Sequence, residues 1–262
     1  MDTLKICTYN IRYDNLGDKN WSWENRKNHI LNLIKFEKFD LFGIQEALFH
    51  QLNDLKTIYK YEFFGIARGD GVSEDEFNGI FYDKNKFEKI DGGYFWLSKT
   101  PDIPSIYKGA GCKRICVWLM LLNKATNKKM VFAVTHLDNA SEEARNFSVN
   151  LILEKLKPYY TNYPFAIMGD FNSLPKDSVY KNFSKVFKEA KVLANMKEKG
   201  TFTLDSDFLV NSVEEKIEID FIFLNNKFNV KNAEILKNNF EGKYFSDHFP
   251  FVININLIGE RL

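Results

Sequence analysis

FAIMGDFN, residues 165–172, is an apolar run that breaks into a polar segment. Its first four residues suit a buried β-strand, and Asp170 and Asn172 follow directly after the break at Gly169. The same order, apolar and then polar, recurs along the chain. Because strand ends in an α/β protein converge on a ligand crevice, this pattern predicts an α/β fold with a functional site where the strands end.

Further β-prone runs lie on both sides of this stretch. They cover residues 4–9, 40–45, 61–66, 79–82, 115–122, 130–135, 217–224 and 249–257. Helical patterns alternate with them after Trp23, within residues 48–55, and after Ser141, an expected N-cap. Some gaps are only turn-sized, such as 123–129, so the sheets should be mixed. Since no linker or repeat divides the chain, we expect one domain over residues 1–262.

Composition narrows the class of protein. The chain has 262 residues, 45% of them hydrophobic and 27% charged, which excludes disordered and fibrous classes. No window approaches the ~18 apolar residues of a membrane helix, and residues 1–7 lack a signal-peptide layout, so we expect a cytoplasmic protein. A net charge of +1 provides no overall field toward long nucleic acid or an anionic membrane. The three cysteines favour neither a disulfide framework nor a zinc site.

Polar, metal-friendly side chains gather at the ends of six apolar runs. The six fragments are TYNIR (8–12), IQE (44–46), VTHLD (134–138), MGDFN (168–172), EIDF (218–221) and SDHFP (246–250). From them come four carboxylates, two asparagines and two histidines, namely Glu46, Asp170, Asp220, Asp247, Asn10, Asn172, His136 and His248. Such an oxygen-rich set suits Mg²⁺ or Mn²⁺ better than zinc.

Each fragment alone also has an ordinary structural interpretation. Asn10 after a strand is commonly a turn or capping residue, and Glu46 could simply favour a helix N-terminus. Asp170 and Asn172 are ordinary turn formers. Asp220 is different, because a carboxylate inside an apolar run must be paired or liganded to be tolerated.

Taken together and in this order, the fragments resemble the endonuclease/exonuclease/phosphatase superfamily of metal-dependent phosphoesterases. The resemblance runs from residue 9 to residue 248, and its most specific pieces are GDFN (169–172) and SDHFP (246–250). The chain resembles the members of a bacterial branch of this superfamily, which is distantly similar to the deadenylase and nocturnin-like members. The resemblance implies a four-layer α/β sandwich, in which two mixed sheets pack face to face with helices outside and one site lies at the sheet edges.

The resemblance also implies a role for each site residue. Glu46 is the main Mg²⁺ ligand, with Mn²⁺ able to substitute, and Asn10 beside it helps to hold metal and phosphate. Asp170 orients or deprotonates the attacking water, while Asn172 donates to a phosphate oxygen.

The remaining side chains complete that implied site. His248 stands at the phosphate with Asp220 fixing its tautomer. Asp247 is a candidate for a second metal position or for orienting the nucleophile, and His136 for a phosphate donor or leaving-group acid.

Substrate contacts are expected from three further residues. Arg114 and Arg145 would add positive charge, although each could equally be an arginine without substrate contact. Asp138, in the fragment VTHLD, is the third candidate, and Arg68 is a similar hypothesis.

Charge and the distant similarity favour a phosphodiester substrate that is a nucleotide, a nucleotide coenzyme or a short nucleic acid. Two alternatives stay open, namely a nuclease acting on polymeric DNA or RNA and a catalytically silent binding module of the same fold. A silent module would have lost Glu46, Asp170 or His248, and all three are present. We expect no membrane partner and find no sign of a protein partner.

Overall fold

The strands form two six-stranded sheets in a computed structural model that describes residues 3–213 and 215–258. The first sheet has the order β13 (Phe228–Ile235), β16 (Phe251–Leu257), β1 (Leu4–Asn10), β2 (Leu41–Ala47), β4 (Phe77–Asp83) and β3 (Tyr61–Ala67). The second has the order β5 (Phe87–Trp96), β6 (Ile115–Asn123), β7 (Lys128–His136), β8 (Phe165–Asp170), β12 (Asp220–Leu224) and β9 (Lys188–Glu189). Both sheets are mixed, because β1 and β2 pair in parallel, as do β7 and β8, among antiparallel neighbours.

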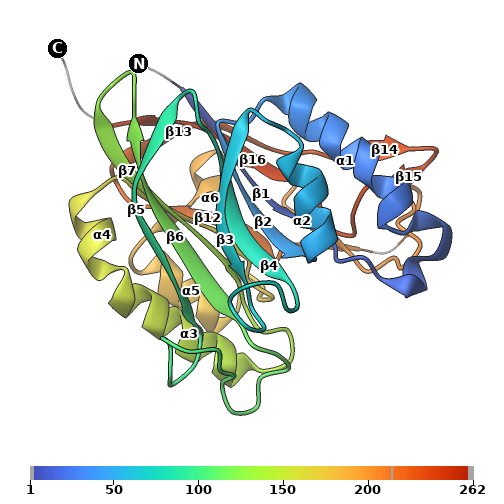
Figure 1. The fold of residues 1–262 in the computed structure, drawn as a ribbon, viewed down its shortest axis with the longest axis horizontal. Coiled ribbons are helices and arrows are strands. Elements are labelled where there is room, and N and C mark those ends of the chain that lie inside the picture. Colours follow the sequence, from blue (N-terminus) through green and yellow to red (C-terminus); the bar gives the residue numbers. More distant parts are fainter. Residues whose placement is uncertain (1–2, 214, 259–262) are drawn as a thin grey trace.

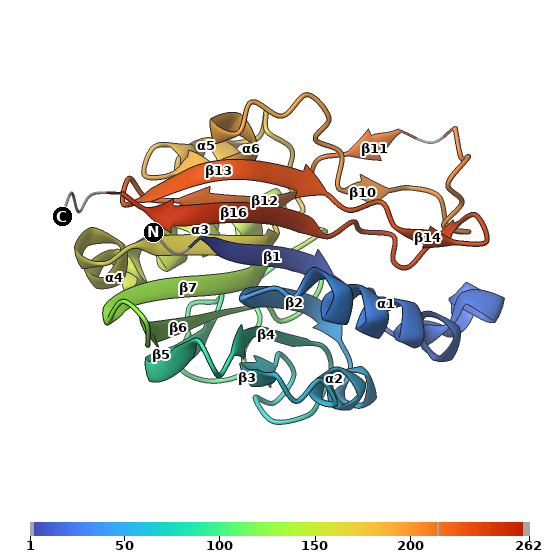
Figure 2. The ribbon, with the colours of Figure 1, turned by 90° about the horizontal axis from the view of Figure 1, so that it is seen from above.

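Helices cover the outer faces of the two sheets (Figures 1 and 2). On the first sheet these are α1 (Trp23–Glu37) and α2 (Phe49–Lys56), and on the second α3 (Glu142–Lys155), α4 (Lys157–Asn162) and α5 (Ser178–Ser184). The 3-10 helix η1 (Leu16–Trp21) contacts α1, and α6 (Ala190–Leu193) contacts β12 and β13, with Ala190 in the core between the sheets. Two short strand pairs lie outside the sheets, β10 (Phe202–Thr203) with β11 (Lys216–Ile217), and β14 (Asn239–Phe240) with β15 (Lys243–Tyr244). Across the described ranges, no helix combines the length and apolar character needed to span a membrane.

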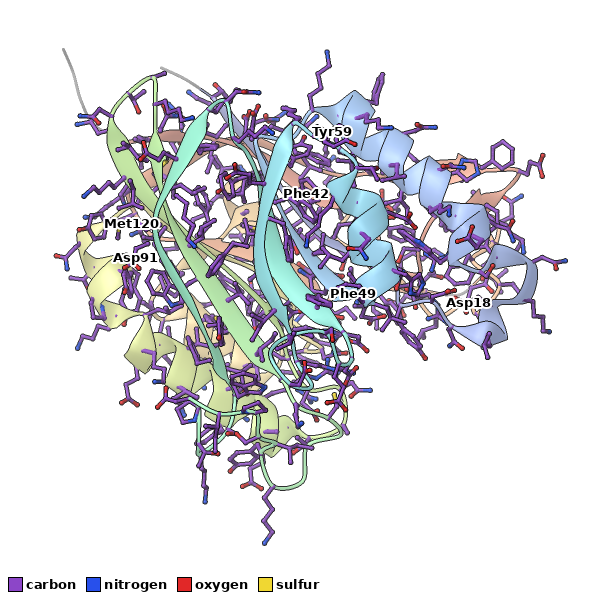
Figure 3. All side chains as sticks on the ribbon, in the orientation of Figure 1. Asp18, Phe42, Phe49, Tyr59, Asp91 and Met120 are labelled. Atoms are coloured by element: carbon purple, nitrogen blue, oxygen red, sulfur yellow. The ribbon has the colours of Figure 1, made fainter. Side chains whose placement is uncertain are left out.

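Alternating side chains along the strands build the layers. On β1, Ile6 packs into the core between the two sheets, whereas Cys7 belongs to the core under α1 and α2. On β2, Leu41 likewise packs between the two sheets and Phe42, labelled in Figure 3, packs under the helices. The Phe42 and Phe81 rings stack with their centroids 4.8 Å apart. A third core joins the second sheet to α3, α4 and α5. The four-layer α/β sandwich is therefore confirmed.

Among the described residues, two long strands, β5 and β13, and four two-residue strands, β9, β10, β14 and β15, escaped the sequence analysis, and one predicted strand is divided. β5 and β13 are edge strands with largely exposed polar faces, so they lack the apolar run that the analysis relied on. The run at 217–224 is two elements, β11 and β12, with the chain changing partners between them. This break matters for the site, because it leaves Asp220 as the first residue of a buried strand.

Candidate active site

The predicted side chains meet where the central strands of both sheets end. Asn10 and His136 are the last residues of β1 and β7, Asp170 is the last residue of β8, and Glu46 is next to last in β2. Asp220 begins β12 directly opposite Asp170 in the antiparallel register. Parallel pairing aligns these ends, as the sequence pattern predicted.

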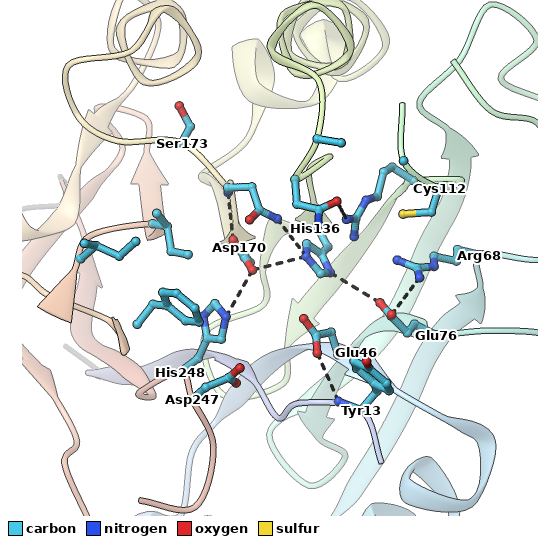
Figure 4. A pocket seen from close by; sticks show the side chains of 18 of the residues that line it. Tyr13, Glu46, Arg68, Glu76, Cys112, His136, Asp170, Ser173, Asp247 and His248 are labelled. Atoms are coloured by element: carbon cyan, nitrogen blue, oxygen red, sulfur yellow. Dashed lines mark hydrogen bonds and ion pairs between the residues drawn. The ribbon is translucent and has the colours of Figure 1, made fainter. Parts of the chain in front are cut away.

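A cavity of about 690 Å³ opens between these strand ends (Figure 4). The site residues that line it are Glu46, His136, Asp170, Asn172, Asp247 and His248. Around them the wall is completed by Tyr13, Arg68, Glu76, Gly111, Cys112, Arg114, Asn139, Ala140, Ser173, Leu174, Asp177, Phe202, Ile217 and Ile219. Its volume suits a small ligand or one end of a larger one.

Glu46 reaches the cavity through an irregularity in β2. The pairing with β4 shifts register here, and Glu46 has a φ of +66°. Left-handed backbone at a residue other than glycine costs about 1–3 kcal/mol, so the surrounding structure must hold it in place. Asn10 Nδ2 donates to Glu46 Oε1 at 2.8 Å, and the Tyr13 amide donates to Oε2 at 3.2 Å. The ordinary interpretation of Glu46 as a helix start is wrong, because α2 begins three residues later.

The turn after β8 is equally constrained. Gly169 has a φ of +145°, and a Cβ there would lie 1.8 Å from the carbonyl oxygen of Thr135. Asn172 has a φ of +46°, with its backbone amide donating to Asp170 Oδ1 at 2.9 Å. The glycine thus allows β8 to approach β7 closely, and this close approach brings Asp170 beside His136.

Asn10 links the two acidic groups. Its Nδ2 donates to Glu46 Oε1 and also to Asp170 Oδ2, the latter at 3.2 Å. Its Oδ1 accepts the Arg12 amide at 3.0 Å. Asn10 is fully buried. In this arrangement it holds the two carboxylates at a fixed separation, and its direct ligation of a metal stays a prediction.

Asp170 is the centre of the cluster. Its Oδ2 lies 3.3 Å from His136 Nε2 and 3.6 Å from His248 Nε2. Burial raises the pKa of Asp170 from 3.8 to about 7, against the opposing effect of the His248 charge. A carboxylate whose pKa lies near neutrality is suited to accept a proton from water.

His248 is the cationic partner in the cluster. It lies just before β16, and its Nδ1 is 2.9 Å from Asp220 Oδ2. Burial opposes its charge, but Asp220 and Asp170 outweigh that effect and raise the pKa of His248 to about 10. The imidazolium therefore presents Nε2–H toward Asp170 and the cavity, and the predicted pairing of His248 with Asp220 is present in the structure.

A buried threonine connects these two partners. Thr201 Oγ1 accepts the backbone amides of Ile219 at 3.2 Å and Asp220 at 3.0 Å. Its carbonyl oxygen accepts the amide of Phe249, next to His248, at 2.7 Å. The side chain is fully buried. Sequence analysis missed Thr201, because its role depends on contacts between distant segments.

His136 carries a different charge from His248. Its Nε2 lies 3.1 Å from Asn172 Nδ2, and its Nδ1 lies 3.8 Å from Glu76 Oε2. Burial, together with the positive charges of Arg114 and Arg68, holds the pKa of His136 well below its usual range. The cluster therefore contains one charged and one neutral imidazole.

Asp247 lines the cavity and forms an ion pair with Arg12 Nη1 at 2.5 Å. Arg12 is itself held by two hydrogen bonds to Asp18, at 2.8 and 2.7 Å. Asp247 thus lies at the cavity with one oxygen committed to an arginine, and its role toward a metal or water stays a prediction.

The predicted substrate residues divide into two groups. Arg114 lines the cavity and is 6% exposed. Asp138 and Arg145 are not among the lining residues. The Asp138 carboxylate accepts three backbone amides, and Arg145 donates to the Asp138 carbonyl oxygen at 2.8 Å. Their proposed contact with substrate stays a prediction.

Glu76 is a cavity residue that sequence analysis missed. It lies in residues 69–77, a stretch rich in acidic residues of the kind found in surface loops, yet its side chain is only 12% exposed. Arg68 Nη2 donates to Glu76 Oε1 at 2.8 Å and turns it inward. Burial and the nearby Glu46 raise the pKa of Glu76 to about 8. The one sequence signal for Glu76 was its position across the β3–β4 hairpin from Arg68, which places the two opposite charges side by side.

The donor set fits a divalent cation. One ligand atom from each of Glu46, Asp170 and His248 lies within 4.8 Å of the others. The carboxylates of Glu46 and Asp170, with that of Asp247 on the same cavity, are hard oxygen ligands of the kind that Mg²⁺ and Mn²⁺ accept, while the charged His248 lies beside them as a hydrogen-bond donor. A cation placed here would also offset the negative charges gathered on the cavity wall.

Comparison with known proteins shows the family of the chain. The sequence profile of the Endonuclease/Exonuclease/phosphatase family matches residues 7–248. A protein of this family from Bacteroides thetaiotaomicron is 33% identical, with a TM-score of 0.91 over 97% of both chains. The mannosyl-6-phosphatase of the same organism is also 33% identical, with a TM-score of 0.91 over 97% of this chain and 99% of that one.

More distant proteins share the architecture. The human nocturnin catalytic domain is 21% identical, with a TM-score of 0.76 over 97% of this chain and 93% of that one, which is a likeness of fold alone. An uncharacterised protein of Acanthamoeba polyphaga mimivirus is 28% identical over 89% of this chain and 92% of its own length. Since the family profile spans every strand-end fragment of the cavity, the chain belongs to the endonuclease/exonuclease/phosphatase family.

Proposed function

We propose that this protein is a divalent-metal-dependent hydrolase of phosphoesters, with Mg²⁺ bound at Glu46 and Mn²⁺ able to replace it. Members of the family hydrolyse phosphoester bonds and generally depend on a divalent metal ion. The observation that carries the proposal is the convergence of Glu46, Asp170 and His248 on one cavity. When bound, the cation would neutralise the phosphate oxygens that otherwise repel an incoming nucleophile.

Asp170 is the base in this proposal. A water oxygen attacks phosphorus, its proton passes to Asp170, and the bond from phosphorus to the ester oxygen breaks. The departing oxygen takes a proton from solvent water and leaves as an alcohol, and Asp170 returns its proton to solvent. Asn10 holds Asp170 toward the cavity, and the pKa of about 7 leaves the group able to accept and release a proton near neutral pH.

Donors on the cavity wall hold the phosphate group. The Nε2–H of His248 carries positive charge. Neutral His136 lies on the other side of Asp170, where Asn172 Nδ2 bonds to the carbonyl oxygen of Leu137 and contacts His136 Nε2, and donation from Asn172 to a phosphate oxygen stays a prediction. Donors fixed before the reaction stabilise the charge that develops on the phosphoryl oxygens. Asp220 keeps Nδ1 of His248 occupied, so that Nε2 faces the phosphate.

We propose a small phosphate ester as the substrate. The cavity volume of about 690 Å³ accommodates a nucleotide or a sugar phosphate, and the similarity to a mannosyl-6-phosphatase supports a small substrate. Preference for a phosphodiester and for a nucleotide stays a prediction from sequence. So do cleavage of polymeric DNA or RNA and a silent binding function as alternatives.

The test is a panel assay with and without Mg²⁺ or Mn²⁺. The panel contains p-nitrophenyl phosphate, bis-p-nitrophenyl phosphate, nucleotide coenzymes, poly(A) and single- and double-stranded DNA. We expect metal-dependent release that is lost in His248→Ala and kept in Glu74→Ala, whose side chain is exposed. Equal rates in chelator and in Mg²⁺, or an active His248→Ala variant, would refute the proposal.

A further inference from the structure

The cavity has two unlike walls. Phe202, Ile217 and Ile219 form an apolar side next to His248. The opposite side is polar and comes from the ends of β3, β4, β6 and β7, with four side chains: Arg68, Glu76, Arg114 and His136. Figure 4 shows His136, Glu76 and Arg68, in that order, leading away from Asp170. The unlike walls suggest that a substrate enters with a defined polar side.

Several polar atoms of this wall have no hydrogen-bond partner among the described residues. They are Arg114 Nε and Nη1, Glu76 Oε2 and His136 Nδ1, all of them buried. Arg68 Nε also has no hydrogen bond, but it forms an ion pair with Asp75 Oδ2 at 3.0 Å. In folded proteins, buried polar atoms are nearly always hydrogen-bonded, to protein or to a ligand or water. Leaving one unpaired costs about 1–3 kcal/mol. Four such atoms on one wall of one cavity therefore mark a position where a polar ligand completes the structure.

The neighbouring side chains do not satisfy these atoms. Arg114 makes one hydrogen bond, from Nη2 to Asn139 Oδ1 at 3.2 Å. Its nearest carboxylate, that of Asp138, lies 3.7 Å from Nε and already accepts three backbone amides. Of the two carboxylate oxygens of Glu76, Arg68 binds Oε1, and Oε2 is left facing the cavity. Hydrogen bonds thus hold the side chains of the wall in place, while the atoms that face the cavity are left to bind a ligand.

The wall also lies beside the reacting centre and separate from it. Glu76 Oε2 is 3.8 Å from Nδ1 of His136, and the other nitrogen of the same ring is 3.3 Å from Asp170. One imidazole ring therefore separates the wall from the proposed base. Given a phosphate at Asp170 and His248, the atoms that reach this wall belong to the organic part of the ester.

We propose that the wall formed by Arg68, Glu76 and Arg114 binds hydroxyl groups on the alcohol part of the substrate, which makes this a hydrolase of polyol phosphates. The inference rests on the proposed function. Arg114 supplies only donors and Glu76 supplies an acceptor, so the ligand must accept and donate at neighbouring atoms. A hydroxyl does both, and vicinal hydroxyls do so in pairs. An alkyl chain does neither, and a fully ionised anionic group accepts but cannot donate.

The experiment compares esters that differ in hydroxyl groups. The probes are glucose 6-phosphate and n-hexyl phosphate, and adenosine 5′-monophosphate distinguishes a nucleoside from a free sugar as the source of the hydroxyls. In the presence of Mg²⁺ we expect kcat/KM for a hydroxylated probe to exceed that for n-hexyl phosphate about tenfold or more. Glu76→Ala should reduce that ratio about tenfold, and Glu74→Ala, in the same loop, should leave it unchanged.

A binding measurement separates this inference from the proposed function. Calorimetry on Asp170→Asn with Mg²⁺ compares the Kd values of glucose 6-phosphate, adenosine 5′-monophosphate and n-hexyl phosphate without turnover, and with Glu76 intact. If the wild type hydrolyses none of the probes but a hydroxylated probe still binds more tightly than n-hexyl phosphate, the proposed function fails and the hydroxyl-binding wall is supported. Equal Kd values for all three probes would overturn the inference. An equal fall of kcat/KM on every ester in Glu76→Ala would also overturn it, because Glu76 would then act by positioning His136 and not by binding substrate hydroxyls.

Discussion

Replacing Asp220 by asparagine should move the titration of His248 by several pH units. In the folded protein the pKa of His248 is raised from 6.5 to about 10, which corresponds to about 5 kcal/mol in favour of the charged ring. The Asp220 carboxylate, 2.9 Å from Nδ1, accounts for most of it, since two charges at that separation attract by about 6 kcal/mol at an effective dielectric constant of 20. Burial acts in the opposite direction and remains after the substitution.

We therefore expect the pKa of His248 to fall to about 7 or below in Asp220→Asn. The assay follows the Cε1–H resonance of His248 against pH in metal-free protein, with His50, which is half exposed, as an internal reference. With Mg²⁺ at pH 7.5, kcat/KM should fall about 10²- to 10⁴-fold, because the charged donor at the phosphate is lost. A His248 resonance that titrates near pH 10 in both proteins would refute this explanation of the pair.

Four further outcomes are expected. Glu46→Gln should weaken Mn²⁺ binding about tenfold or more by calorimetry, because one of the two carboxylates in the cluster is removed. Gly169→Ala should lower the free energy of unfolding by about 3 kcal/mol or more in urea, since its Cβ would lie 1.8 Å from the Thr135 oxygen. Thr201→Val should lower kcat/KM about tenfold with Thr201→Ser close to wild type, because serine keeps the hydroxyl that accepts two amides. The folded-state pKa of His248 lies above its ordinary value of 6.5, so its stabilising effect is full below that pH and lost as pH rises through about 10; urea unfolding of metal-free protein should show this fall.

The strand-end residues could be predicted because their signal is local. Asn10, His136 and Asp170 each follow an apolar run within one continuous segment. Strand pairing then brings those ends together without further information, since parallel neighbours end at the same edge. Glu46 needed more, because a bulge with left-handed backbone turns it into the cavity.

Residues held by contacts between distant segments could not be predicted. Glu76 lies in an acidic stretch of the kind found on surfaces, and only its ion pair with Arg68 across the β3–β4 hairpin turns it inward. Thr201 precedes a two-residue strand, and its role comes from accepting backbone amides of two other segments. Asp138 was expected at the site because it lies two residues after His136; its carboxylate accepts backbone amides, and its contact with substrate stays a prediction.

The most direct test is p-nitrophenol release from p-nitrophenyl phosphate and bis-p-nitrophenyl phosphate as a function of Mg²⁺ concentration, in wild type and in Asp170→Asn. The account predicts a rate that saturates with Mg²⁺, vanishes in chelator and falls about 10²- to 10⁴-fold in the variant, because Asp170 accepts the proton of the attacking water. A rate on either ester that is independent of Mg²⁺, or that survives in Asp170→Asn, would contradict it.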